Sequence, residues 1–128
     1  MNIWDGMRPG RDRPKTPNGK WFVLDKPIII SEFGGEALYG NNSGPKDEAA
    51  SWNEVYQEQI YKDQIEMFKN IPNLSGTCPW ILADFRSLGR MHPIYQNGWN
   101  RKGLLSDRGD KKKAWFILQK YYESIMQF

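Results

Sequence analysis

The sequence predicts an α/β protein built from two β-α units in tandem, and three observations support this. The first is the run Ile28-Ile29-Ile30, whose β-branched residues without apolar/polar alternation are typical of a strand buried on both faces of a parallel sheet. The second is that apolar residues recur at helical spacing after this run and again near the end of the chain. The third is a mostly uncharged segment, 74–85, between the two helical stretches. Two such units leave a sheet with uncovered faces and edges, so the predicted fold is incomplete as given.

Length and composition fit one globular domain of 128 residues, of which 39% are hydrophobic and 14% aromatic. The net charge of +3 is modest, so nucleic acid is not an expected partner. The single cysteine Cys78 excludes a cysteine-rich metal site, and His92 has no partner at metal-ligand spacing, so we expect neither a metal nor a cofactor. No apolar run approaches about 18 residues and no signal-peptide pattern follows Met1, so we expect a soluble chain, in a compartment that the sequence leaves open.

Residues 1–23 are expected to form an irregular arm, because three prolines and two glycines within 7–19 forbid a long regular element. The isoleucine strand follows, and it ends in Ser-Glu-Phe-Gly-Gly, where the chain must turn. In parallel α/β proteins the chemistry lies at the carboxyl ends of the strands. Glu32 is therefore the first candidate catalyst, and the alternative is an acid that caps the next element or pairs with a nearby base.

A first helix is predicted after a loop at 36–50 that is rich in small and polar residues. Ser51 and Glu54 have the capping-box spacing at its start, and the helix should end near Asn70, ahead of Pro72. Its apolar stripe consists of Val55, Tyr56, Ile60, Tyr61, Ile65 and Phe68.

The second strand candidate, 74–85, contains Pro79, which removes one ladder hydrogen bond. A regular strand should end there and the backbone should bend at Trp80. A long loop is expected over 86–110, in which Arg86 and Arg90 neutralise Asp84, face solvent or approach an acidic ligand.

A last helix is predicted from an apolar stripe, and Asp110 is its expected cap. Lys111, Lys112 and Lys113 crowd its first turn, where the helix dipole disfavours cations. They form either a solvated basic turn or a site with an anion held nearby. The stripe consists of Ala114, Leu118, Tyr121, Tyr122 and Ile125.

Three phrases together resemble glycoside hydrolase family 2, the β-glucuronidases and β-galactosidases: Ser-Glu-Phe-Gly at 31–34, Pro-Trp-Ile-Leu-Ala-Asp-Phe at 79–85 and Asn-Arg-Lys-Gly at 100–103. The resemblance is to the carboxyl-terminal end of the family's catalytic (β/α)8 TIM barrel. It implies that residues 24–128 are the last quarter of that barrel, with strands seven and eight and their helices. The remainder of the barrel, or another chain, would then complete the fold.

The resemblance implies a retaining exo-β-glycosidase that hydrolyses O-glycosidic bonds, with Glu32 in the position of the nucleophile. A retaining glycosidase needs one carboxylate beneath the anomeric carbon and a second carboxyl group about 5–5.5 Å away as acid and then base. In this family the second group is a glutamate after an asparagine on the fourth strand, which precedes anything in this chain. The isolated chain is therefore expected to be inactive.

The resemblance also implies substrate-binding residues. Trp80 matches a tryptophan that forms the floor of the sugar pocket, and the alternative is a large core residue. Asp84 either orders the mouth of the site through hydrogen bonds or braces the loop. Asn100 and Lys102 match the Asn-x-Lys pair with which β-glucuronidases hold the sugar carboxylate. A β-glucuronide is therefore the leading substrate. A β-galactoside is the alternative, because related galactosidase-like sequences contain a similar Asn-x-Lys-Gly motif.

Two other classes of function stay open. A non-catalytic carbohydrate-binding or assembly module would keep Trp80 and the 100–102 loop and would pair with another chain. A nucleic-acid binder has only the basic arm and the lysine triplet 111–113 in its favour.

Overall fold

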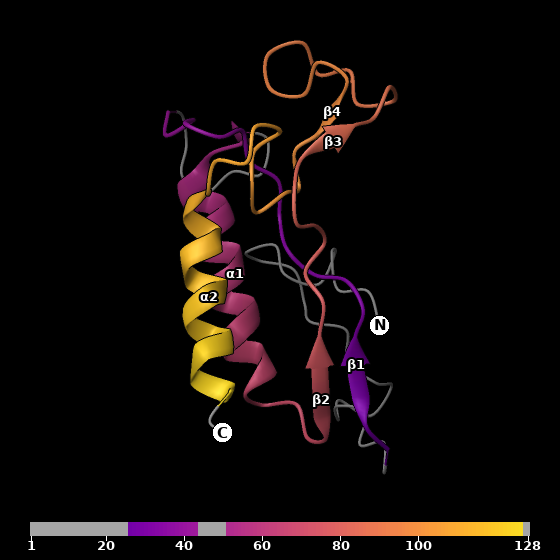
Figure 1. Cartoon of the computed structure of the whole chain (residues 1–128), viewed down its shortest axis with the longest axis vertical. Helices are drawn as coiled ribbons and strands as arrows, with labels where there is room; N and C mark the ends of the chain where they lie inside the picture. Colours follow the sequence, from indigo (N-terminus) through magenta and orange to yellow (C-terminus); the bar gives the residue numbers. More distant parts are fainter. Residues whose placement is uncertain (1–25, 44–50, 127–128) are drawn as a thin grey trace.

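The computed structural model describes residues 26–43 and 51–126, and the arm expected at 1–23 lies outside them. The elements of the described part are β1 (Ile28–Ile30), α1 (Glu54–Phe68), β2 (Leu74–Thr77), β3 (Phe85–Arg86), β4 (Trp99–Asn100) and α2 (Lys113–Ile125). The chain thus runs through a β-α-β unit, a short hairpin and a final helix (Figure 1). This is the α/β organisation that the sequence predicts.

The strands β1 and β2 are adjacent and parallel, and Ile30 of β1 pairs with Thr77 of β2. Beyond the strands the two segments stay together, because Cys78 N–H donates to Ile30 O (2.8 Å) and Trp80 N–H donates to Phe33 O (2.8 Å). β2 ends at Thr77, ahead of Pro79, as the sequence predicts. The segment that carries Trp80 therefore runs alongside the segment that follows β1.

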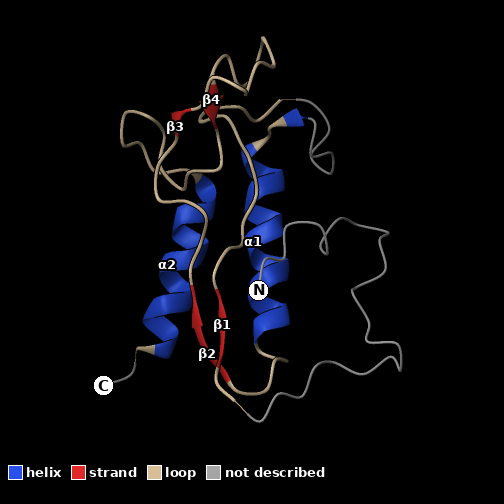
Figure 2. Ribbon diagram, turned by 90° about the vertical axis from the view of Figure 1, so that its right-hand side faces the viewer, coloured by secondary structure: helices blue, strands red, loops and turns tan. Residues whose placement is uncertain are grey.

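The helices α1 and α2 lie together on one side of the strand pair (Figure 1). Ile30 is fully buried, whereas Ile29 is 59% exposed. The prediction of a strand buried on both faces is therefore wrong for this chain as it stands, because the described residues supply a helical layer for one face only. Figure 2, turned by 90°, looks from the strand side and shows α1 on the side of β1 and α2 on the side of β2.

The first helix begins at Glu54, and the predicted cap Ser51 lies three residues before that start. Its N-cap is Asn53, whose side chain accepts a hydrogen bond from Val55 N–H (2.7 Å). The carboxylate of Glu54 accepts instead from Gly40 N–H (2.5 Å) and from Lys113 N–H (2.9 Å). The capping-box prediction is wrong because these two distant amides engage the glutamate.

The second helix has Lys112 as its N-cap, without a side-chain capping bond. The predicted cap Asp110 accepts a hydrogen bond from Ser106 Oγ (2.8 Å) instead, and the amide of Lys113 is satisfied by Glu54. The interpretation of the lysine triplet as a solvated turn fits Lys111 and Lys113, which are exposed. It is wrong for Lys112, which is completely buried.

The loop predicted over 86–110 contains a small antiparallel hairpin, in which Phe85 pairs with Asn100 and Arg86 pairs with Trp99. The Arg86 guanidinium lies 5.1 Å from the centroid of the Trp99 ring, a cation–π contact that crosses the hairpin. Strands of two residues carry too little periodicity to be recognised in the sequence.

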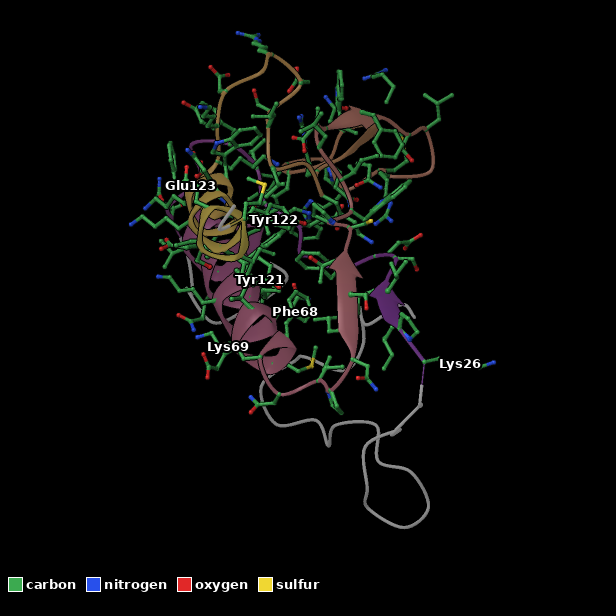
Figure 3. The ribbon with its side chains drawn as sticks, turned by 60° about the horizontal axis from the view of Figure 1, so that its bottom comes forward. Lys26, Phe68, Lys69, Tyr121, Tyr122 and Glu123 are labelled. Atoms are coloured by element: carbon green, nitrogen blue, oxygen red, sulfur yellow. The ribbon has the colours of Figure 1, made fainter. Side chains whose placement is uncertain are left out.

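The core lies between the helices and the strands. Phe33 is its centre, because its ring meets Phe68 edge-on at 4.9 Å and Tyr61 at 5.6 Å. Tyr121 and Tyr122 of α2 extend the aromatic packing (Figure 3), and the Tyr122 hydroxyl donates to Thr77 O (2.8 Å). The buried cluster consists of Ile30, Phe33, Tyr61, Phe68, Leu104, Ala114 and Leu118. Neither helix of the described ranges is long and apolar enough to cross a bilayer.

Gly34→Ala should destabilise the chain by roughly 2–4 kcal/mol, as urea unfolding would measure. Gly34 has a φ of +131°, and an added Cβ would lie 2.5 Å from the Tyr61 hydroxyl and 3.3 Å from Trp80 O. Gly89→Ala is the matched control, because a Cβ there has nothing within 4 Å. Equal losses for the two variants would contradict this account of the turn after β1.

Candidate functional site

Glu32 lies two residues beyond the end of β1, where it is half-buried. The next residue, Phe33, is anchored in the core and its carbonyl accepts the hydrogen bond from Trp80 N–H. The structure therefore places Glu32 at the carboxyl end of a parallel strand, next to the segment that follows the neighbouring strand.

Trp80 is half-buried and its ring meets Phe85 edge-on at 6.3 Å. The Trp80–Ile81 peptide bond is cis. The chain continues alongside the 102–104 segment, since Ile81 N–H donates to Lys102 O (3.2 Å) and Leu104 N–H donates to Ile81 O (3.0 Å). These bonds bring the tryptophan segment and the Asn-Arg-Lys-Gly loop together.

The Asn100–Lys102 loop is a turn closed by its own side chain, because Asn100 Oδ1 accepts from Lys102 N–H (3.0 Å). Since Oδ1 is used in this way, the amide nitrogen Nδ2 is the group of Asn100 that suits an anionic ligand. The loop is fastened to the segment after β1: Ala37 N–H donates to Arg101 O (3.1 Å), and Arg101 N–H donates to Glu36 Oε1 (3.3 Å). The predicted nucleophile and the predicted sugar-binding pair thus occupy the same end of the fold.

Asp84 lies beneath this loop, with a side chain that has no exposure to solvent. Its Oδ1 accepts from Lys112 Nζ (2.8 Å) and Gly103 N–H (2.9 Å), and its Oδ2 accepts from Arg101 Nη1 (3.3 Å). Asp84 thus connects the 101–103 segment to the start of α2.

The charges of Asp84 and Lys112 depend on each other. Burial raises the pKa of the Asp84 carboxyl, and the ammonium of Lys112 opposes that rise. Burial likewise lowers the pKa of Lys112, and the carboxylate opposes that fall. The interpretation in which Arg86 or Arg90 neutralises Asp84 is wrong. The partners are Arg101 and Lys112, which the fold and not the local sequence brings near.

Glu36 is a further residue that the sequence did not single out. Its carboxylate accepts from Gln96 Nε2 (3.2 Å) and from Arg101 N–H (3.3 Å), and it pairs with Arg90 (3.5 Å). It therefore holds the 90–101 region against the segment after β1. No local signal distinguishes it from a solvated acid, because its partners lie more than fifty residues away.

The described residues include no group of three or more His, Cys, Asp and Glu side chains placed to hold a metal ion. His92 packs instead in an aromatic cluster, with its ring 4.8 Å from Trp52 and 5.0 Å from Tyr95.

Comparisons with known proteins find similar sequences and similar folds, although no family model matches the chain. A β-glucuronidase of Streptococcus agalactiae is 37% identical over 109 residues, which are 77% of this chain and 16% of that protein. The β-glucuronidase of Rattus norvegicus is 30% identical over 108 residues, 82% of this chain and 16% of the enzyme. The crystal structure of a family 2 β-galacturonidase from Eisenbergiella tayi bound to galacturonate superposes with a TM-score of 0.67 at 25% identity, over 78% of this chain and 17% of that one.

The fold and these relatives place the chain with the glycoside hydrolases. Within that class, its matched residues form a β-glucuronidase-like region of glycoside hydrolase family 2. The chain spans about a sixth of the length of the curated relatives it matches, 16% in each case.

Asp84→Ala should cost about 3–5 kcal/mol of stability, because it leaves the buried Lys112 ammonium without its counter-charge. Asp107→Ala is the matched control. Asp107 also pairs with Arg101, at 2.8 Å, but its side chain is 28% exposed, so its loss should cost less than about 1 kcal/mol. Thermal unfolding of the two variants measures the difference in stability. Similar losses of stability would show that burial does not determine how much each ion pair contributes.

Proposed function

We propose that the described residues are the last two β-α units of a (β/α)8 barrel, with β1 and β2 as strands seven and eight. The parallel pairing of β1 with β2 and the helix after each strand support this topology. The exposure of Ile29 supports it as well, because the side chains of other barrel strands would cover that face. The remainder of the barrel would come from a further part of the protein or from another chain.

The proposed activity is that of a retaining exo-β-glycosidase in which Glu32 is the nucleophile. A Glu32 oxygen attacks the anomeric carbon and the bond to the aglycone oxygen breaks, while an acid donates a proton to that oxygen. Water then attacks the same carbon, gives its proton to the base that the acid has become, and releases the sugar and Glu32. The acid/base belongs, in this proposal, to the part of the barrel that this chain does not supply, so the chain alone does not hydrolyse glycosides.

The proposed substrates are β-glucuronides. The main observation in favour of this substrate class is that hydrogen bonds attach the Asn100–Lys102 loop to the segment that follows Glu32. An amide donor and an ammonium in one turn suit a sugar carboxylate, because charge-assisted hydrogen bonds are the strong ones. Relatives that are β-glucuronidases, and a neighbour bound to galacturonate, support a uronate. The β-galactoside alternative gives this pair no carboxylate to bind.

Within the proposed site Trp80 would lie against the apolar face of the sugar. Its half-buried ring beside Phe85 suits that contact, and its backbone bond to Phe33 fixes it next to Glu32. Asp84 would act from below, as the brace of the 100–103 loop.

A chimaera tests the nucleophile. The part of the S. agalactiae β-glucuronidase to which this chain aligns is replaced by this chain, and hydrolysis of 4-nitrophenyl β-glucuronide is measured. We expect turnover by the chimaera and none by the chain alone. Glu32→Gln should lower kcat at least about a thousandfold, because the carbonyl oxygen of an amide is a poor nucleophile.

Glu66→Gln is the control, because Glu66 is exposed on α1 and pairs with Lys69 at the surface. Its activity should be unchanged. Unchanged activity of Glu32→Gln would exclude Glu32 as the nucleophile. Turnover by the chain alone, lost in Glu32→Gln, would show that the acid/base is within this chain.

Lys102→Met in the chimaera tests the substrate. It should lower kcat/KM for the glucuronide by about 10- to 100-fold, which corresponds to one charged hydrogen bond, and should leave the slow hydrolysis of the matching glucoside within about threefold. Lys120→Met, at an exposed position of α2, should change neither rate. Equal losses on the two substrates would argue against recognition of the uronate carboxylate by Lys102.

A further inference from the structure

Lys112 is a fully buried lysine that no part of the proposed reaction uses. Lysine is almost never completely buried unless it is paired. Here the ammonium donates to Ala37 O (2.6 Å), to Asp84 Oδ1 (2.8 Å) and to Arg101 O (3.0 Å). The three donors of one side chain are thus used on three different segments.

Each of these segments belongs to the proposed site. Ala37 follows the turn after Glu32, Asp84 follows Trp80, and Arg101 lies between Asn100 and Lys102. One side chain at the start of α2 therefore connects the nucleophile segment, the tryptophan segment and the sugar-binding loop.

A second buried side chain makes a parallel connection. Gln57 of α1 donates from Nε2 to Gly35 O (2.9 Å) and to Gly103 O (3.2 Å). Gln57 joins two of the segments without a charge, whereas Lys112 joins all three and balances the carboxylate beneath the loop. Of the two, Lys112 is therefore the one whose removal should release the loop.

We propose that Lys112 is a positioning residue that sets the place of the Asn100–Lys102 loop relative to Glu32 and thereby selects substrates that carry a carboxylate. The inference rests on the proposed function. Recognition of a uronate requires Lys102 to reach the C6 carboxylate while Glu32 reaches the anomeric carbon of the same sugar, and a misplacement of about 1 Å costs on the order of a hundredfold in rate. Lys112 does not touch the substrate, and its effect passes through the carbonyls of Ala37 and Arg101.

Hydrogen exchange of the full chain separates positioning from general stability. The Ala37 amide donates to Arg101 O and the Lys102 amide donates to Asn100 Oδ1, so both amides report on the loop. In Lys112→Met we expect these two amides to exchange at least tenfold faster, relative to amides in the middle of α1 and α2. Lys113→Met is the control, because its side chain is exposed, and it should leave all these rates unchanged. A uniform acceleration across loop and helices in Lys112→Met would overturn the proposal.

Kinetics of the chimaera test the consequence for specificity. The readout is the ratio of kcat/KM for 4-nitrophenyl β-glucuronide to that for the β-glucoside, since loss of folded enzyme alone lowers both values equally. Lys112→Met should lower this ratio at least tenfold, and Lys113→Met should not alter it. A change of less than tenfold in Lys112→Met would overturn the proposal.

The double variant Asp84→Asn, Lys112→Met keeps the test valid if Lys112→Met folds poorly. It removes the unpaired buried charge together with the connection, so folding should recover while the glucuronide/glucoside ratio stays low. A ratio restored to that of the parent would overturn the proposal. If the parent chimaera does not cleave glucuronides at all, the proposed function fails, and hydrogen exchange alone decides whether Lys112 positions the loop.

Discussion

The arrangement of the candidate site depends on an ion pair that water does not reach. Transfer of an ammonium and a carboxylate out of water costs several kcal/mol for each ion, and only good geometry and further hydrogen bonds offset that cost. Lys112 and Asp84 meet this condition, because the lysine also donates to two carbonyls and the aspartate also accepts from Gly103 N–H and Arg101. The segments joined in this way are 75, 28 and 11 residues from Lys112 in the chain. Backbone hydrogen bonds join the same segments in pairs, and Lys112 connects all three of them to the start of α2.

The buried face of the first helix makes polar contacts near its start and apolar contacts near its end. Near its start, which lies at the carboxyl end of the strands (Figure 1), the polar Glu54 and Gln57 are buried beside Tyr56, and these two polar side chains bind backbone groups of the turns. Near its end Phe68 is buried and packs on Phe33, although the polar Gln64 is buried there as well. The helix therefore anchors irregular loops at one end and the apolar core at the other, and for that reason its stripe is not apolar throughout.

This division explains which features the sequence predicted. The isoleucine strand, the two helices and the end of β2 ahead of Pro79 depend on local chemistry, and they were predicted correctly. The start of the second helix was wrong because Asp110 binds Ser106, four residues before it in the loop. The start of the first helix was wrong because the partners of Glu54, Gly40 and Lys113, are distant in the sequence. The role of Lys112 was hidden for the same reason. Three lysines in the first turn of a helix were nonetheless a signal that one of them has a buried partner.

The candidate site was predicted from motifs, and the fold adds the relation between them. The resemblance named Glu32, Trp80 and the Asn100–Lys102 loop separately, and the backbone bonds from Trp80 to Phe33 and between Ala37 and Arg101 bring their segments to one end of the strand pair. Those bonds all lie within the described residues, so the geometry proposed for sugar recognition is set locally.

The face of the sheet that carries Ile29 is different, because nothing in the described part of the chain covers it. A second carboxyl group for a two-carboxylate mechanism would have to approach the sugar from outside this local unit. In the proposed enzyme, sugar recognition would therefore use residues of this region, whereas the acid/base would come with the strands that cover the face of Ile29.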